Sequence, residues 1–144
     1  MKSIMLRKSA TLVICFMMII FVSSEAKAQF KFGVGGSLTT SPFYVGPQAR
    51  LGFDISDNVR LSGAGTYYLG SSSFFAIDVD ARYKLAAIGN VAIEPLAGIH
   101  INNGVALNAG VHFRIERDKN DIYIEPKVII DDAAIFVLSG GLFF

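Results

Sequence analysis

The sequence predicts an all-β fold in which eight antiparallel strands close into an up-and-down barrel. Two observations carry this prediction. Apolar and polar residues alternate with a period of two throughout 29–144, and turn-forming residues interrupt the alternation seven times. No stretch after residue 28 repeats apolar residues at the 3.6-residue spacing of a helix. A segment of this length is enough for one domain.

The first 28 residues have the pattern of a secretory signal peptide. Lys2, Arg7 and Lys8 give a positive start, and an unbroken apolar run occupies 12–22. Small residues then lead to an A-x-A site, so we expect cleavage after Ala28. A membrane-anchoring helix is the alternative, but this run falls well short of the roughly 20 residues that a span needs.

Charge and cysteine content exclude several classes of function. Without residues 1–28, nine positive and eleven negative residues remain, a net charge of −2, and nothing in their distribution indicates nucleic-acid binding. The single cysteine, Cys15, lies within the apolar run of the signal peptide. The mature chain is therefore expected to have no thiol catalysis, cysteine metal site or disulfide, and we expect no cofactor.

Each predicted strand ends at a turn signal. Glycine and asparagine provide positive φ angles there, while proline and aspartate favour turn entry. In chain order, strand 29–37 precedes the turn 39–42, strand 45–55 precedes 56–58, strand 59–69 precedes 70–73, and strand 74–85 precedes 86–90. Strand 91–101 precedes 102–104, strand 105–115 precedes 116–121, strand 122–130 precedes 131–133, and strand 134–144 is the last. Strands of this length match tilted membrane-spanning strands, since globular strands usually have 5–6 residues.

One face of these strands is apolar throughout and carries no charge. All twenty charges after residue 28 fall on the opposite face or in turns. Such a strict pattern requires a sheet with two very different sides. The apolar face consists of Phe30, Phe32, Val34, Ala49, Leu51, Phe53, Ile55, Val59, Leu61, Tyr67, Leu69, Phe75, Ile77, Val79, Ala81, Tyr83, Leu85, Val91, Ile93, Ala97, Ile99, Ile101, Val105, Leu107, Ala109, Val111, Phe113, Ile115, Ile122, Ile124, Val128, Ile130, Phe136, Leu138, Leu142 and Phe144.

The total volume of the side chains on this face decides which face of the sheet lies inside the barrel. Its 36 mostly large side chains far exceed the roughly 12 that a filled eight-stranded core accommodates. The opposite face combines charges with small polar residues and many glycines, a set that can pack into a narrow tube. We therefore predict a transmembrane barrel with its apolar side toward lipid and its polar side enclosed.

Aromatic residues are expected to form two belts at the membrane–water interfaces. With both ends of the barrel strands in the periplasm, one group falls near the periplasmic rim and the other near the outer rim. The periplasmic group is Phe30, Tyr83, Tyr123 and Phe144, and the outer group is Phe43, Tyr44, Tyr67, Tyr68, Phe74, Phe75 and Phe136.

The signal peptide, the eight alternating strands and the terminal phenylalanine resemble the small eight-stranded outer-membrane barrels of the OmpA/OmpX type. The resemblance covers 29–144 and is one of pattern, without a diagnostic motif. It implies an outer-membrane location in a Gram-negative-type bacterium, with the lipid bilayer and the barrel-insertion machinery as partners. The signal for that machinery is expected in the last strand, at Phe136, Leu138, Leu142 and Phe144. Unlike adhesive members, whose outer loops are long, this chain has only three or four residues in the outer loops 70–73, 102–104 and 131–133.

Strand pairing through the predicted turns places charged residues in a row across the lumen. Asp54 is expected opposite Arg60, and the row itself is Arg82, Glu94, His112 and Glu125. Each pairing can slip by two residues. A proton-sensitive or ion-binding site is one interpretation of the row. A structural ion network that fills the narrow barrel is favoured, because buried charges must be paired. A metal site is not expected, since His100 and His112 lie far apart.

The sequence favours a non-enzymatic protein with a structural or envelope-interaction role. Three alternatives stay open: a narrow pore through the charged lumen, a lipid-modifying outer-membrane enzyme, and a secreted soluble barrel that binds a small apolar ligand. An enzyme acting on lipid needs a nucleophile and a base at the lipid face. Both histidines instead fall on the polar face, and neither lies within two residues of a serine in the sequence.

Overall fold

A computed structural model describes residues 30–144 as nine β-strands. The predicted signal peptide, 1–28, lies outside these residues. The strands are β1 (Phe30–Thr40), β2 (Phe43–Asp54), β3 (Val59–Tyr68), β4 (Phe74–Tyr83), β5 (Ala86–Ile88), β6 (Val91–Ile101), β7 (Val105–Ile115), β8 (Asp121–Ile130) and β9 (Ala134–Phe143). No helix in this part of the chain is long and apolar enough to cross a membrane.

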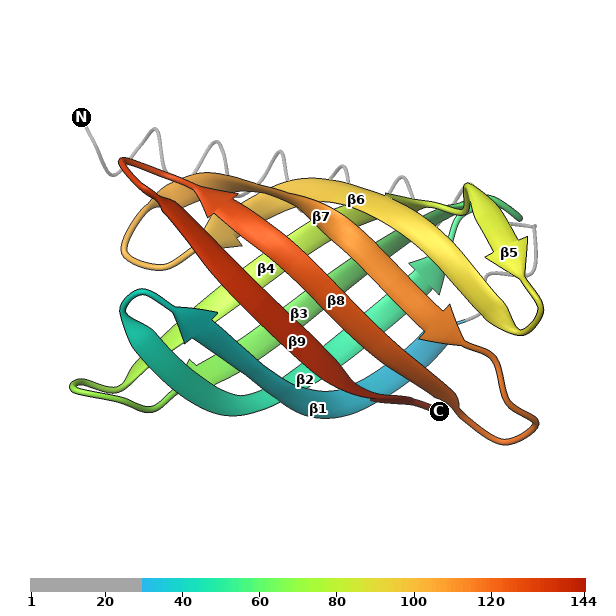
Figure 1. The fold of residues 1–144 in the computed structure, drawn as a ribbon, viewed down its shortest axis with the longest axis horizontal. Coiled ribbons are helices and arrows are strands. Elements are labelled where there is room, and N and C mark those ends of the chain that lie inside the picture. The colour runs from blue at the N-terminus through green and yellow to red at the C-terminus, as the bar shows by residue number, and fades with distance from the viewer. Residues whose placement is uncertain (1–29) are drawn as a thin grey trace, which may run out of the picture.

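The eight long strands form a closed antiparallel barrel. Consecutive long strands pair with each other, β4 pairs with β6, and β1 pairs with β9 to close the ring. The strands run obliquely to the long axis of the tube (Figure 1), as barrel closure requires. This confirms the predicted fold class. The end that holds Phe144 is called the C-terminal end below, and the opposite end the distal end.

The barrel exposes its apolar face and encloses its polar face. Outward residues such as Phe75, Ile77 and Leu107 are 56%, 41% and 63% exposed. Inward residues that alternate with the outward ones along β4, such as Asp78 and Asp80, are only 1% exposed. Because successive side chains of a strand point to opposite faces, the alternation of residue types produces this arrangement directly. The predicted orientation, with the apolar face outside and the polar face inside, is therefore confirmed.

Short turns connect the strands at the distal end. They lie together at one end of the tube, away from Phe144 (Figure 1). The turn between β1 and β2 holds only residues 41–42, shorter than predicted, because Leu38↔Val45 and Thr40↔Phe43 extend the pairing. The other three span 69–73, 102–104 and 131–133. Positive φ at Asn103 fits its tight turn, since asparagine tolerates this region.

The connection between β4 and β6 differs from the predicted five-residue loop. The Leu85 amide donates to the Ile93 carbonyl, and Ala86 also pairs with Ile93, so two residues oppose one. This is the arrangement of a β-bulge. The hairpin continues through β5 to a two-residue turn at 89–90, where Gly89 has a φ of 61°. Extension of the hairpin shifts the register by two residues, so Arg82 pairs with Leu96 where Glu94 was predicted.

The seam between the first and last strands is rich in glycine. Two consecutive cross-strand pairs, Gly35↔Gly141 and Gly36↔Gly140, have no side chain on either strand. The strands approach closely here: a Cβ atom on Gly141 would lie 2.2 Å from the Val34 carbonyl oxygen. Only glycine therefore fits this position, and backbone hydrogen bonds provide most of the pairing.

Candidate functional site in the lumen

The lumen is filled by charged and polar side chains, which make it the candidate site. Inward positions of residues 30–144 carry six basic residues, six acidic residues and two histidines. The basic set is Lys31, Arg50, Arg60, Arg82, Arg114 and Lys127; the acidic set is Asp54, Asp78, Asp80, Glu94, Asp121 and Glu125; the histidines are His100 and His112. Equal numbers of both signs permit pairing, which buried charges require.

The central contact is an ion pair that spans the lumen from β2 to β8. Arg50 Nη1 lies 2.5 Å from Glu125 Oε2, and Nη2 lies 2.8 Å from Oε1, so the pair is bidentate. Both side chains are fully buried. Arg50 Nε donates to Gln48 Oε1 at 3.2 Å, and the guanidinium stacks over the Tyr123 ring at 4.7 Å. Since β2 and β8 are not neighbours in the sheet, this pair ties opposite walls together.

His112 lies between the central Arg50–Glu125 pair and Glu94. Its Nδ1 atom lies 2.7 Å from Glu125 Oε2, and its Nε2 atom lies 4.0 Å from Glu94 Oε2. The imidazole stacks on Tyr123, with ring centroids 5.4 Å apart. His112 is fully buried, so the ring is enclosed between β6, β8 and the neighbouring aromatic side chain.

A second cluster lies toward the distal end, around Lys127. The Lys127 ammonium is 3.3 Å from Asp78 Oδ1, 3.5 Å from Asp80 Oδ2 and 3.6 Å from Glu125 Oε1. His100 Nδ1 lies 2.8 Å from Asp78 Oδ1, which also accepts a hydrogen bond from Asn108 at 3.3 Å. Lys127 thus links β8 to β4 on the far side of the ring.

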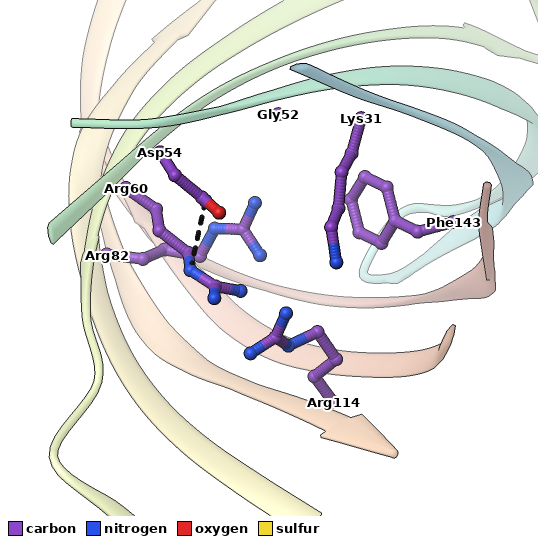
Figure 2. A pocket seen from close by; sticks show the side chains of 7 residues that line it. All are labelled: Lys31, Gly52, Asp54, Arg60, Arg82, Arg114 and Phe143. Atoms are coloured by element: carbon purple, nitrogen blue, oxygen red, sulfur yellow. Dashed lines mark ion pairs between the residues drawn. The ribbon is translucent and has the colours of Figure 1, made fainter. Parts of the chain in front are cut away.

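A third cluster occupies the C-terminal end and is dominated by arginine. Glu94 has the guanidiniums of Arg60, Arg82 and Arg114 at 3.3, 3.9 and 3.7 Å. Arg60 also pairs with Asp54 at 3.1 Å. Figure 2 shows these three arginines pointing into one small pocket, together with Lys31 and the ring of Phe143. The Arg82 guanidinium lies 5.7 Å from the centre of that ring.

Aromatic side chains close the distal end of the lumen beside β2, β3 and β4. Tyr68 is 1% exposed and bonds Ser37 through its hydroxyl at 2.9 Å. Phe74 packs against Tyr68 and Tyr44, with ring centroids 5.1 and 5.0 Å away. Together with the charged clusters, these rings fill the middle of the lumen and the part of its distal end beside β2, β3 and β4. A pocket of about 210 Å³ lies on the other side of the distal end, lined by residues that include His100, Asn102 and Ile129.

The structure brings most of the predicted row together. Asp54 faces Arg60, and Glu94 faces His112, in the predicted register. His112 contacts Glu125 by the hydrogen bond given above. Arg82 is displaced by two positions along β6, yet its guanidinium still reaches Glu94.

Arg50 is the main residue that the sequence prediction missed. Its phase on β2 places it in the lumen, on the same inward face as Gln48 and Gly52. The prediction paired only neighbouring strands, however, whereas Arg50 finds its partner across the tube. An arginine side chain on the inward face of a narrow barrel is long enough to reach the far wall, and this length could have indicated a partner across the lumen.

The predicted residues of the last strand all lie on its outward face. Phe136, Leu138 and Phe144 are 42%, 36% and 61% exposed, and Leu142 is half-buried. The Phe144 amide continues the seam by donating to the Phe32 carbonyl at 2.7 Å. These residues are therefore in one apolar stripe.

Four aromatics of the predicted belts face inward instead, so the belt assignment is wrong for these four. Tyr68 and Tyr123 are 1% and 0% exposed. Phe74 is paired with Tyr68 across β3 and β4, and Tyr44 packs against Phe74 on the same side. The Tyr68 hydroxyl bonds Ser37, and the Tyr123 hydroxyl donates to Gln48 Oε1 at 3.1 Å. Other predicted belt residues, including Phe30, Tyr83 and Phe43, are 50–66% exposed.

The charged side chains of the lumen are mostly paired with one another and fill the middle of the barrel. Within residues 30–144 no group of three or more histidine, cysteine, aspartate or glutamate side chains could hold a metal ion. The nine buried side-chain atoms without a hydrogen-bond partner in this part of the chain belong mostly to the third cluster. They are Arg60 Nε, Ser62 Oγ, Asp80 Oδ1, Arg82 Nε, Glu94 Oε1 and Oε2, Asn108 Oδ1, His112 Nε2 and Arg114 Nε.

Comparison with solved structures finds membrane barrels. The N-terminal β-barrel domain of Pseudomonas aeruginosa OprF aligns with a TM-score of 0.68 at 15% identity, over 82% of this chain and 98% of that domain. The fold is that of a small outer-membrane β-barrel. A de novo designed transmembrane β-barrel aligns with a TM-score of 0.60 at 14% identity, over 84% of this chain and 97% of the design.

The attachment invasion locus protein Ail of Yersinia pestis, solved with the heparin analogue sucrose octasulfate, is also similar to this barrel. It aligns with a TM-score of 0.53 at 13% identity, over 83% of this chain and all of that one. No protein-family model and no curated protein sequence matches the chain. At these identities the comparisons establish the shared fold, as the pattern-level resemblance implied.

Proposed function

We propose that this barrel is an integral outer-membrane protein with a structural or envelope-interaction role, and that it is neither a pore nor an enzyme. The observation that carries the proposal is the combination of an exposed apolar exterior with a lumen packed by paired charges. A soluble barrel with this exterior would expose a continuous apolar surface to water, which favours aggregation. A bilayer removes that problem.

The closed lumen supports a non-conducting role. The Arg50–Glu125 pair crosses the tube, and Lys127 bridges β8 to Asp78 and Asp80 on β4. Ions can pass only if these contacts break, and breaking a buried pair costs about 3–5 kcal/mol. Eight-stranded barrels are in general just wide enough for side chains to fill them.

The positions of the histidines support a non-enzymatic role. His112 is fully buried and His100 is 9% exposed, and both bond lumen carboxylates. An enzyme that modifies membrane lipid needs a base at the lipid face. Analysis of lipid A from cells with and without the protein tests this part: any new acyl or phosphoryl pattern that depends on the protein would contradict it.

The envelope-interaction part of the proposal is restricted by the short distal turns. In the proposed orientation these turns face outward, and none of 41–42, 69–73, 102–104 or 131–133 contains lysine or arginine. Polyanions such as the heparin analogue bound to Ail are therefore not expected partners at this end. The last strand, with its outward stripe Phe136, Leu138, Leu142 and Phe144, is the proposed recognition element for the insertion machinery.

Fractionation and conductance test the proposal directly. The protein should be recovered with outer membranes and should show heat-modifiable mobility on gels, whereas recovery in the soluble periplasm would refute membrane insertion. Purified protein in planar bilayers should show no steady openings. Steady openings that change when Arg82 or Glu94 is neutralised would establish the narrow pore in its place.

A further inference from the structure

The pocket at the distal end of the lumen is large enough for a small organic molecule. Its volume is about 210 Å³, far more than one water molecule needs and less than the roughly 300–1,000 Å³ of a site for a drug-sized ligand. The turns 102–104 and 131–133 border it at the distal end of the barrel (Figure 1). Its lining combines polar side chains with an apolar wall: His100, Asn102, Asn103 and Asp131 on one hand, Ile129 and Ile135 on the other.

His100 offers an unused ring nitrogen to this pocket. The residue is only 9% exposed, and its Nδ1 atom lies 2.8 Å from Asp78 Oδ1. Asn108 and Lys127 also contact this oxygen, each at 3.3 Å, so Asp78 acts as the acceptor and Nδ1 carries the hydrogen. Within residues 30–144 the Nε2 atom has no polar partner. In the neutral ring, Nε2 is therefore a buried acceptor available to a ligand.

The charges around the pocket favour a cation. Asp131 belongs to the lining and Asp132 follows it, while none of the four distal turns contains lysine or arginine. Lys127 is the basic side chain of the neighbouring cluster, and its ammonium is already shared by three carboxylates at 3.3–3.6 Å. A concave site whose charge is of one sign concentrates ligands of the opposite sign.

We infer that this pocket binds a small organic cation of the primary aliphatic amine class. A primary ammonium group has three N–H donors, which Asp131, His100 Nε2 and an asparagine amide oxygen can accept. The hydrocarbon part of the ligand packs on the apolar wall at Ile129 and Ile135. A quaternary ammonium has no N–H donor and is typically held by aromatic rings, and none of the described lining residues is aromatic. The inference adds a ligand to the proposed role and holds whichever end of the barrel faces outward.

An NMR titration of the folded protein in micelles tests the inference. The probe is pentylamine at pH 8, where an alkylamine is protonated as lysine is. Pentan-1-ol and pentanoate are matched probes with no charge and with the opposite charge. Pentylamine should give saturating shifts of the Ile129 and Ile135 methyl resonances and of the His100 ring. The methyl resonances of Ile124, which is 48% exposed on the outside of the barrel, report partition into the micelle and should not follow this curve. Shifts that never saturate, or an equal midpoint for pentan-1-ol or pentanoate, would overturn the inference.

Two substitutions of equal charge locate the site. Asp131→Asn removes the carboxylate of the lining, and Asp132→Asn removes the neighbouring carboxylate outside it. Asp131→Asn should raise the pentylamine midpoint at least fivefold, whereas Asp132→Asn should change it less than twofold. Ala106→Leu places extra side-chain volume in the pocket and should abolish the saturating shifts without any change of charge. Equal midpoints for the two aspartate variants, or full binding by Ala106→Leu, would refute the site. Unheated gel mobility confirms that each variant is folded.

Discussion

Replacing Arg50 by methionine removes the guanidinium that spans the lumen, and this substitution tests whether the charged interior stabilises the barrel. The variant loses the bidentate contact with Glu125, the hydrogen bond to Gln48 and the contact with the Tyr123 ring. Methionine keeps most of the aliphatic volume and adapts to irregular space. The change therefore removes charge pairing with little loss of packing.

The magnitude follows from the burial of both partners. Neither side chain of the pair is exposed, and removing one member of a buried pair typically costs about 3–5 kcal/mol because the other charge is left uncompensated. Glu125 retains His112 at 2.7 Å and Lys127 at 3.6 Å, which limits the loss. We expect Arg50→Met to lower the free energy of unfolding by roughly 3–5 kcal/mol.

A double-mutant cycle with Glu125→Gln assigns the loss to the pair. The two residues are in direct contact, so a coupling free energy of about 0.5–3 kcal/mol is expected. The matched control is Lys84→Met, whose pair with Glu116 is 3.9 Å long and partly exposed. A surface pair of this kind contributes about 0–1 kcal/mol.

The assay is urea unfolding in lipid vesicles, with the folded fraction read from unheated gel mobility. The sequence contains no tryptophan, so tryptophan fluorescence is not available as a probe. If Arg50→Met and Lys84→Met cost the same, or if the cycle gave no coupling, the assignment of a stabilising role to the lumen network would be refuted.

Three further predictions concern the exterior, the glycines and conduction. Val79→Arg at mid-barrel should cost about 2–4 kcal/mol in the same assay, whereas Tyr83→Arg near the rim should cost about 0–1 kcal/mol; equal costs would contradict the proposed depth. Gly98→Ala places a Cβ atom 2.1 Å from the Val79 carbonyl oxygen and should lower stability measurably, while Gly104→Ala, with nothing within 4 Å, should be tolerated. Single-channel recordings of the unmodified protein should show no steady conductance, and sustained openings would contradict a packed lumen.

The sequence was sufficient to predict the barrel and its polarity because each strand carries its own information. Alternation along β4 places Ile77 and Val79 outside and Asp78 and Asp80 inside, and no long-range contact is needed to see it. Turn residues then set the strand boundaries, which the structure moves by a few residues at most, as at 41–42.

The register between β4 and β6 could not be predicted from the turn alone. The residues 86–90 read as a loop, yet the bulge at Leu85 and Ala86 lets the hairpin continue and leaves only Gly89 and Asn90 as the turn. A bulge adds one residue to one strand and leaves no distinct mark in an alternating pattern. Arg82 consequently moved from Glu94 to Leu96.

The cross-lumen contacts were also beyond the reach of sequence reasoning. Pairing rules relate neighbouring strands, whereas Arg50 and Glu125 are on β2 and β8 with two strands between them. The same limit explains Tyr123, which the belt pattern assigned to the membrane interface. Its phase on β8 puts the ring inside, where the Arg50 guanidinium and His112 stack on it.

The glycine pairs between β1 and β9 weaken the junction at which the tube closes. Cross-strand side-chain contacts stabilise neighbouring strands, and they are missing at Gly35↔Gly141 and Gly36↔Gly140. Amide protons of these residues should exchange with deuterium before those of β6 and β7, whose eleven registered pairs are uninterrupted. Separation here turns the ring into an open sheet with two free edges, and closing it again joins the two strands that are most distant along the described chain.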